Sequence, residues 1–294
     1  MKDTRLTIGL TSFNRRDLLV CVAESLAQVR HIDSARIFVL DDCSTEFDLE
    51  FLRDLFPNAT VLRNERNSGR ADFAIHQLWS HFVETGSGYL LSLDSDLLAS
   101  RNLIDKCREI ILNDVARPEP CLYDLFNTPN HEASGECEGF LVKRTVGSAG
   151  TLWRHDLLAE VLANIPASGT YDWDWSAHLR HRGIPIRVTR KSYVQHIGTS
   201  GQNTRSVIGM DHGEGFEGYA GHNLAVFLDQ TREGLLRAIA VQKAQLDHQS
   251  ARLDRQSVQL DKQSEAIRQL SQVMQTQGQV LQQVIAEVCA SQHS

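Results

Sequence analysis

The chain has 294 residues, which suits one large domain or two smaller ones with a real core. Its hydrophobic fraction of 41% and charged fraction of 23% are ordinary for a globular protein, and its net charge of -7 argues against a broad nucleic-acid-binding surface. No apolar run is long enough to span a bilayer, and the N-terminus lacks the layout of a signal peptide. We therefore expect a cytoplasmic protein without a transmembrane segment, and a peripheral position at the inner face of the membrane stays open.

Strands and helices are predicted to alternate through the first hundred residues. Short apolar runs predict strands, and apolar residues at helical spacing predict helices. The predicted strands cover residues 5–11, 37–40, 59–62 and 89–93, and the predicted helices cover residues 16–29, 49–56 and 70–84. This order predicts an α/β fold with a mixed, mostly parallel sheet and right-handed crossovers.

Polar residues follow each predicted strand. The four groups are Thr11, Ser12, Asn14 and Arg15; Asp41 and Asp42; Asn67, Gly69 and Arg70; and Asp94, Ser95 and Asp96. The carboxyl ends of parallel strands meet at one edge of a sheet, where ligands bind in open α/β folds. We therefore expect all four groups to converge there.

The acidic pair Asp94 and Asp96 follows the most apolar of these strands. Two carboxylates one residue apart repel each other unless a positive group lies between them. A hard divalent cation that shares its coordination with substrate phosphates is the simplest candidate. The alternative is that Asp94 caps the next helix and that Asp96 is solvated.

As a set, these motifs resemble the nucleotide-binding half of family-2 glycosyltransferases with the GT-A fold. The segments that carry the resemblance are Thr-Ser-Phe-Asn-Arg, Asp-Asp-Cys-Ser, Asn-Ser-Gly-Arg and Asp-Ser-Asp, in this order and spacing. The resemblance covers about residues 4–228. It implies a Rossmann-like transferase domain that binds a nucleotide-diphosphate sugar, with UDP as the expected nucleotide, and a divalent cation, Mn²⁺ or Mg²⁺.

The resemblance also implies roles for single residues. The loop from Thr11 to Arg15, with Asp41 and Asp42, is expected to hold the base and ribose, and Asp41 to contact uracil. Asn67 and Gly69 are expected to shape a close turn. Arg70 faces the diphosphate or, equally, is a solvated helix residue. Asp96 is the expected direct metal ligand, and Asp94 binds ribose or the water shell of the metal.

Further along, residues 171–175 read Tyr-Asp-Trp-Asp-Trp at the start of a predicted helix. Carboxylates favour a helix start for capping reasons alone. In family-2 enzymes, however, an acidic pair here carries the catalytic base, usually as Glu-Asp-x-Asp, and Tyr171 replaces the Glu. The resemblance therefore implies Asp172 as the base that deprotonates an acceptor hydroxyl, with Asp174 as the fallback, and a single displacement with inversion.

Three tryptophans are candidates for a platform that faces acceptor or donor sugar rings. Trp173 and Trp175 flank the acidic pair, and Trp153 lies in a segment that resembles the one leading into the acceptor-side helix of the family. Core packing is the alternative for each of them.

His196 follows a predicted strand, where a histidine is usually structural. The resemblance to GT-A enzymes implies instead that His196 completes the metal site, and that the glycine-rich stretch of residues 199–221 forms a lid over the diphosphate. Arg205 is its candidate phosphate contact, and His212 is a weaker one.

From residue 229 the composition changes, and an apolar residue recurs every seven positions. This row comprises Ile239, Leu246, Leu253, Leu260, Ile267, Met274, Leu281 and Val288. The companion row three residues on is mostly glutamine, which weakens the seam. We predict a catalytic domain over 1–228 and a coiled-coil helix over 229–294 that makes a homo-oligomer. Packing of one helix against the catalytic domain, or binding of another protein, is the alternative.

The resulting hypothesis is an inverting, metal-dependent glycosyltransferase with a glycan, lipid-linked or protein acceptor, acting in surface-polysaccharide or glycoconjugate synthesis. One alternative is a sugar nucleotidyltransferase, although the chain lacks an early glycine-rich triphosphate loop. Another is a non-catalytic scaffold that displays a degenerate transferase domain on a coiled coil.

Overall fold

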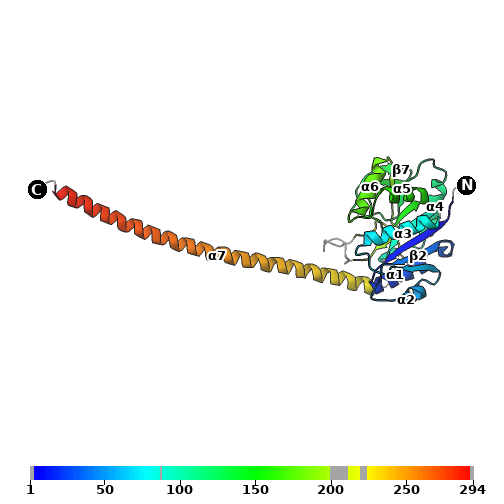
Figure 1. Ribbon diagram of the computed structural model, residues 1–294, viewed down its shortest axis with the longest axis horizontal. Helices are drawn as coiled ribbons and strands as arrows, with labels where there is room; N and C mark the ends of the chain where they lie inside the picture. Colours follow the sequence, from blue (N-terminus) through cyan, green and yellow to red (C-terminus); the bar gives the residue numbers. More distant parts are fainter. Residues whose placement is uncertain (1–2, 87, 199–210, 219–223, 292–294) are drawn as a thin grey trace. The chain divides into compact units, whose positions relative to one another are not determined.

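The computed structural model describes residues 3–86, 88–198, 211–218 and 224–291 (Figure 1). It separates into two compact units, residues 1–234 and 235–294. The expected boundary after residue 228 stays a prediction. In the described residues no helix is long and apolar enough to cross a membrane. The five cysteines described there are all free thiols.

The first unit alternates strands and helices in the predicted order. The helices are α1 (Arg16–Ala27), α2 (Leu49–Leu55), α3 (Ala71–Thr85), α4 (Leu103–Asp114), α5 (His155–Asn164) and α6 (Tyr171–His181), with a 3-10 turn over Ile32–Ser34. The strands are β1 (Leu6–Ser12), β2 (Arg36–Asp41), β3 (Ala59–Arg63), β4 (Tyr89–Asp94), β5 (Leu97–Ala99), β6 (Leu122–Asp124), β7 (Ala133–Cys137), β8 (Phe140–Lys143), β9 (Thr151–Arg154), β10 (Ile186–Thr189) and β11 (Val194–His196).

Nine strands form one mixed sheet in the order β3-β2-β1-β4-β9-β6-β10-β8-β7, and β5 pairs with β11 in a small second sheet. Strands β3, β2, β1 and β4 are parallel. Strand β9 is antiparallel to both β4 and β6, and β8 is antiparallel to β10 and β7. All the other strands of the large sheet therefore run the same way, which confirms the predicted mixed, mostly parallel α/β fold.

The sheet is covered on both faces. Side chains of α1, α2 and α4 share one buried apolar cluster with alternate strand residues such as Val39. Side chains of α3, α5 and α6 share the other with residues such as Phe38. This alternation is what a strand buried on both faces requires. The two layers leave the carboxyl ends of β1, β2, β4 and β6 together at one edge.

Helix α7 (Leu224–Ser291) runs for 68 residues. At 1.5 Å per residue this is a rod of roughly 100 Å. The seven-residue row from Ile239 to Leu281 is more than half exposed at every position. An apolar stripe that faces water does not stabilise an isolated helix, because no apolar area is buried. In the described residues this stripe therefore has no packing partner.

Candidate active site

The acidic pair lies where the sequence predicted it, at the carboxyl end of β4. Asp94 ends the strand and accepts a hydrogen bond from Thr11 Oγ1 at 3.0 Å, across the parallel pairing of β1 and β4. Asp96 lies in the turn to β5 and is 3% exposed. Burial and the neighbouring charge of Asp96 raise the pKa of Asp94 to about 6. The site therefore holds more negative charge than its surroundings compensate.

Two basic side chains reach the same oxygen of Asp96. Arg15 Nη1 donates to Asp96 Oδ2 at 2.6 Å, and His196 Nε2 lies 3.2 Å from that oxygen. Burial alone would raise the pKa of Asp96, but His196 and Arg15 hold it well below its usual range. Burial opposes protonation of His196, yet Asp96 and the other carboxylates raise its pKa.

Asp94, Asp96 and His196 match a Mn²⁺ or Mg²⁺ site in the chemistry of their donors, two carboxylates and an imidazole. Within the described ranges, however, no three such side chains are already arranged around a metal-sized point. The guanidinium of Arg15, which rests on Asp96 Oδ2, accounts for part of this difference. The donor atoms of these residues are of the type that Mn²⁺ or Mg²⁺ binds, but the guanidinium of Arg15 would have to move away from Asp96 first.

Asp172 lies in the first turn of α6 and carries an unpartnered oxygen. Its Oδ1 is buried and has no hydrogen-bond partner among the described residues. Burial and the charges of Asp72 and Asp94 raise the pKa of Asp172 to about 7. Asp174 differs, because its Oδ2 accepts hydrogen bonds from the hydroxyl groups of Ser168 and Thr170 in the turn before the helix. The geometry therefore favours Asp172 over Asp174 as a proton acceptor.

Asp72, which acts on Asp172, was not among the predicted site residues. It lies in the first turn of α3, two residues after the predicted contact Arg70. Burial raises its pKa as well. The signal in the sequence was an acid at a helix start that follows a strand and a polar loop, whereas Asp172 was predicted from the family resemblance.

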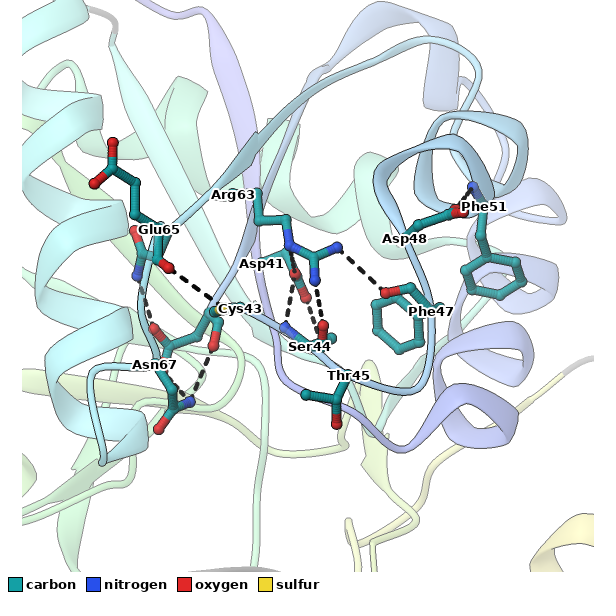
Figure 2. Close-up of polar contacts among 12 residues, drawn as sticks. Asp41, Cys43, Ser44, Thr45, Phe47, Asp48, Phe51, Arg63, Glu65 and Asn67 are labelled. Atoms are coloured by element: carbon teal, nitrogen blue, oxygen red, sulfur yellow. Dashed lines mark hydrogen bonds and ion pairs between the residues drawn. The ribbon is translucent and has the colours of Figure 1, made fainter.

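Asp41, the predicted uracil contact, is bonded within the chain. Asp41 is 0% exposed, and both of its carboxylate oxygens already accept hydrogen bonds or ion pairs within the chain. Figure 2 shows its partners: Ser44 donates through Oγ and through its backbone N–H, and Arg63 Nε lies 3.4 Å away. Asp41 therefore holds the loop after β2 in shape and leaves no exposed acceptor for a pyrimidine.

Asp42 is used in the same way. It is 2% exposed and accepts from Asn64 Nδ2, from Asn67 Nδ2 and from both the N–H and Oγ of Ser68. These bonds join the loop after β2 to the loop after β3. Asn67 Oδ1 in turn accepts from the N–H of Gly69, whose φ of 84° is one that glycine adopts without strain. The predicted close turn at Asn67 and Gly69 is present, with Asp42 as its anchor.

The loop after β1 is fixed by similar contacts. Asn14 and Arg15 both have left-handed backbones, with φ of 51° and 56°. Asn14 Oδ1 accepts from the N–H of Thr45 at 2.8 Å, which ties this loop to the one after β2. Ser12 is buried, and its Oγ has no hydrogen-bond partner. The side chain of Asn14 therefore stabilises the neighbouring loop rather than pointing its amide oxygen to a ligand.

Only one of the three predicted platform tryptophans faces solvent. Trp153 and Trp175 are fully buried and pack edge-on against each other in the core, with ring centroids 5.2 Å apart. Neither has a face to offer a sugar, so core packing is correct for both. Trp173 is 60% exposed, and its ring lies 6.2 Å from that of His131, which also contacts Thr145. His131 precedes β7 and Thr145 follows β8, and neither was among the predicted site residues.

Several expectations concern residues 199–221. Arg205 and most of the predicted lid lie outside the described residues. His212 is described and is exposed. Its neighbour Asp211 accepts from Thr128 Oγ1 and from Asn130 Nδ2, which anchors this end of the segment beside the loop that carries His131.

Residues 7–117 match the model of the family described as Glycosyl transferase family 2. This match confirms the predicted resemblance of these residues to family-2 glycosyltransferases, and the sheet order agrees with the mixed, mostly parallel α/β sheet that the resemblance implied. No curated protein sequence matches the chain significantly.

Among solved structures, the chain is similar to S. aureus TarS 1-349, with 16% identity and a TM-score of 0.48 over 65% of this chain and 59% of that one. The same protein in complex with UDP-GlcNAc gives 16% identity and a TM-score of 0.48 over 74% and 60%. The mannosyltransferase PcManGT from Pyrobaculum calidifontis, in complex with GDP-Man and Mn2+, gives 14% and 0.47 over 64% and 58%. The chain thus spans less than two thirds of the length of each.

Proposed function

We propose that the chain is an inverting glycosyltransferase that moves a sugar from a nucleotide-diphosphate donor to a hydroxyl acceptor. The observation that carries the proposal is the unpartnered Oδ1 of Asp172, with a pKa raised to about 7, at the sheet edge that also holds Asp94 and Asp96. A carboxylate with such a pKa is a competent base near neutral pH. The family-2 match over residues 7–117 supports the reaction class.

In the proposed reaction Asp172 accepts the proton of the acceptor hydroxyl. The acceptor oxygen forms a bond to the anomeric carbon while the bond from that carbon to the diphosphate oxygen breaks, so the nucleoside diphosphate leaves with the electron pair. One displacement inverts the anomeric centre. Trp173, exposed one residue from the base, offers an apolar face to a sugar ring.

A divalent cation is part of the proposal. Asp96 and His196 would hold it, with Asp94 nearby, and when bound it stabilises negative charge on the departing diphosphate. UDP is the donor nucleotide we expect from the resemblance. Because Asp41 is unavailable to uracil, the base has to be tested directly.

The test is calorimetric titration of the full chain with UDP and with GDP, each in Mn²⁺ and in chelator. Binding of one nucleotide that depends on Mn²⁺ supports the donor class and the metal together. Binding of neither nucleotide to the folded protein contradicts the proposal and favours the non-catalytic scaffold.

We further propose that α7 forms a homo-oligomeric coiled coil. Its support is the row of apolar side chains from Ile239 to Leu281, one every seven residues, each more than half exposed. Three successive heptads repeat Leu-Asp-basic-Gln-Ser, beginning at Leu246, Leu253 and Leu260. In a parallel pair of α7 helices, each of these leucines would pack against the same leucine of the second chain. A role in surface-polysaccharide or glycoconjugate synthesis, at the inner face of the membrane or in the cytoplasm, remains a proposal that depends on the acceptor.

A further inference from the structure

One carboxylate oxygen at the centre of the site is enclosed by the protein itself. Asp96 Oδ2 contacts Arg15 Nη1 at 2.6 Å and His196 Nε2 at 3.2 Å. A Cβ placed on Gly198 would lie 2.2 Å from the same oxygen and 3.0 Å from Arg15 Nη1. The backbone of Gly198 therefore lies against a third side of this oxygen.

A divalent cation on this oxygen would lie about 2.0–2.6 Å from it. His196 can stay in place by turning a nitrogen lone pair to the metal. Arg15 cannot, because a guanidinium is always protonated and has no lone pair to donate. A metal on Asp96 Oδ2 would therefore compete with the guanidinium of Arg15 for this oxygen, since the two positive groups repel each other.

The backbone of Arg15 is fixed by hydrogen bonds, so only its side chain has to move. Its backbone carbonyl accepts from the N–H of Leu19 at 3.1 Å at the start of α1, and the preceding Asn14 is bonded to Ser44. The left-handed backbone at Asn14 and Arg15 persists because such contacts hold it. The side chain of Arg15 is 33% exposed, so the guanidinium has solvent-accessible space to turn into.

We propose that Arg15 is an internal counter-ion that competes with the divalent cation for Asp96. When the cation arrives with the donor, the displaced guanidinium becomes a ligand of the donor diphosphate. Arg15 thereby couples the two binding events: metal alone binds weakly, and the diphosphate strengthens it by giving the guanidinium a new anionic partner. The handover to the diphosphate rests on the proposed function, whereas the competition for Asp96 does not.

The test measures Mn²⁺ binding to the full chain, by the loss of the free-ion electron paramagnetic resonance signal, without nucleotide. We expect Arg15→Ala and Arg15→Gln to bind Mn²⁺ about 10-fold more tightly than the native chain, which corresponds to a cost of about 1.4 kcal/mol for breaking the ion pair. Arg16→Ala is the matched control, because Arg16 is the next residue but stacks on Phe51 instead. Its Mn²⁺ affinity should equal that of the native chain.

Unchanged or weaker Mn²⁺ binding in both Arg15 variants, or no Mn²⁺ binding by any variant, overturns the competition. Circular dichroism of each variant establishes that it is folded, and Arg15→Gln serves if Arg15→Ala is not. A second arm repeats the titration with UDP or GDP, which should tighten Mn²⁺ binding more in the native chain than in the Arg15 variants. If the nucleotide tightens Mn²⁺ binding equally in the native chain and in the Arg15 variants, the proposed transfer of the guanidinium to the diphosphate is wrong. A native chain that binds neither nucleotide refutes the proposed function, while the first arm still decides the competition.

Discussion

Arg70 Nη2 donates a hydrogen bond to the backbone oxygen of Gly169 at 3.3 Å, across 99 positions of sequence. It joins the loop after β3 to the turn before α6, and thus the nucleotide half of the site to the helix that carries Asp172. A Cβ on Gly169 would lie 2.3 Å from the guanidinium. The absence of a side chain at Gly169 is therefore what allows Arg70 to reach this turn.

This contact leads to a first prediction. We expect Arg70→Ala to weaken nucleotide-diphosphate binding about 10-fold, in line with the loss of one charge-assisted contact. Gly169→Ala should displace only the end of a flexible side chain and change the free energy of unfolding by less than about 1 kcal/mol. Calorimetry and urea unfolding measure the two effects. Arg66→Ala, an exposed change in the same loop, is the control. If Arg70→Ala binds the nucleotide diphosphate as tightly as the native chain does, Arg70 only links the two loops and does not contact the donor.

The second prediction concerns the base. Asp172→Asn should lower the transfer rate by about 10²–10⁴-fold, because the acceptor proton loses its recipient. Nucleotide binding should persist, since Asn keeps the shape of the side chain. Asp174→Asn should mainly weaken the hydrogen bonds that Asp174 Oδ2 accepts from Ser168 and Thr170, at a cost of about 1 kcal/mol in stability, and leave most of the rate. Full activity in Asp172→Asn would remove the assignment.

The pKa of Asp172 gives a third prediction. Because the base acts only when ionised, the transfer rate should rise with pH and level off above about 7. Its folded-state pKa lies above the ordinary value of 3.8, so the folded state holds the proton longer and loses stability relative to the unfolded state as pH rises between the two values. Asp172→Asn should therefore gain stability over the native chain at pH 8 relative to pH 4, as measured by thermal unfolding. A gain that does not depend on pH would argue against the shifted pKa.

Trp173 and Trp175 provide a matched pair of substitutions on one helix. Trp175→Ala should cost about 3–5 kcal/mol of unfolding free energy, because it empties a fully buried site. Trp173→Ala should change stability by about 0.5 kcal/mol or less and raise KM for the acceptor. Urea unfolding and steady-state kinetics separate the two. An unchanged acceptor KM in Trp173→Ala would leave the exposed ring without a role in sugar binding.

The fifth prediction concerns α7. Light scattering should give the native chain a mass that is a multiple of 33.0 kDa. Leu253→Asp with Leu260→Asp should reduce it to a single chain, because charges would face each other in the apolar layers. Ala251→Asp, which lies off the leucine row, should keep the native mass. A single-chain mass for the native protein would favour a tail that binds another protein.

The sequence alone predicted well which segments of the first half form strands and which form helices. Each apolar run there is bounded by turns, and an amphipathic helix separates it from the next. Strand 5–11 was expected and β1 covers Leu6–Ser12. The antiparallel insertion of β9 between β4 and β6 was not predicted, since pairing across the sheet leaves no local pattern. The short pairing of β5 with β11 was missed for the same reason.

Site residues followed a similar division. The strand pattern predicted that Asp94 and Asp96 lie at the sheet edge, whereas His196, which lies 3.2 Å from Asp96, was predicted from the family resemblance. It could not show that Asp41 is consumed by Ser44 and Arg63, since Arg63 arrives from the end of the next strand. Nor could it tell Trp173 from its neighbour Trp175, because the exposure of each depends on which face of α6 packs against the sheet.

Gly198 limits which amino acids the chain can carry beside Asp96. A Cβ at this position would lie 2.2 Å from Asp96 Oδ2, so any side chain there would push against the carboxylate. A substitution of Gly198 would therefore have to displace the carboxylate of Asp96 or the backbone after β11. Glycine thus contributes to this site through the space that it leaves, although it supplies no charge or polar side chain of its own.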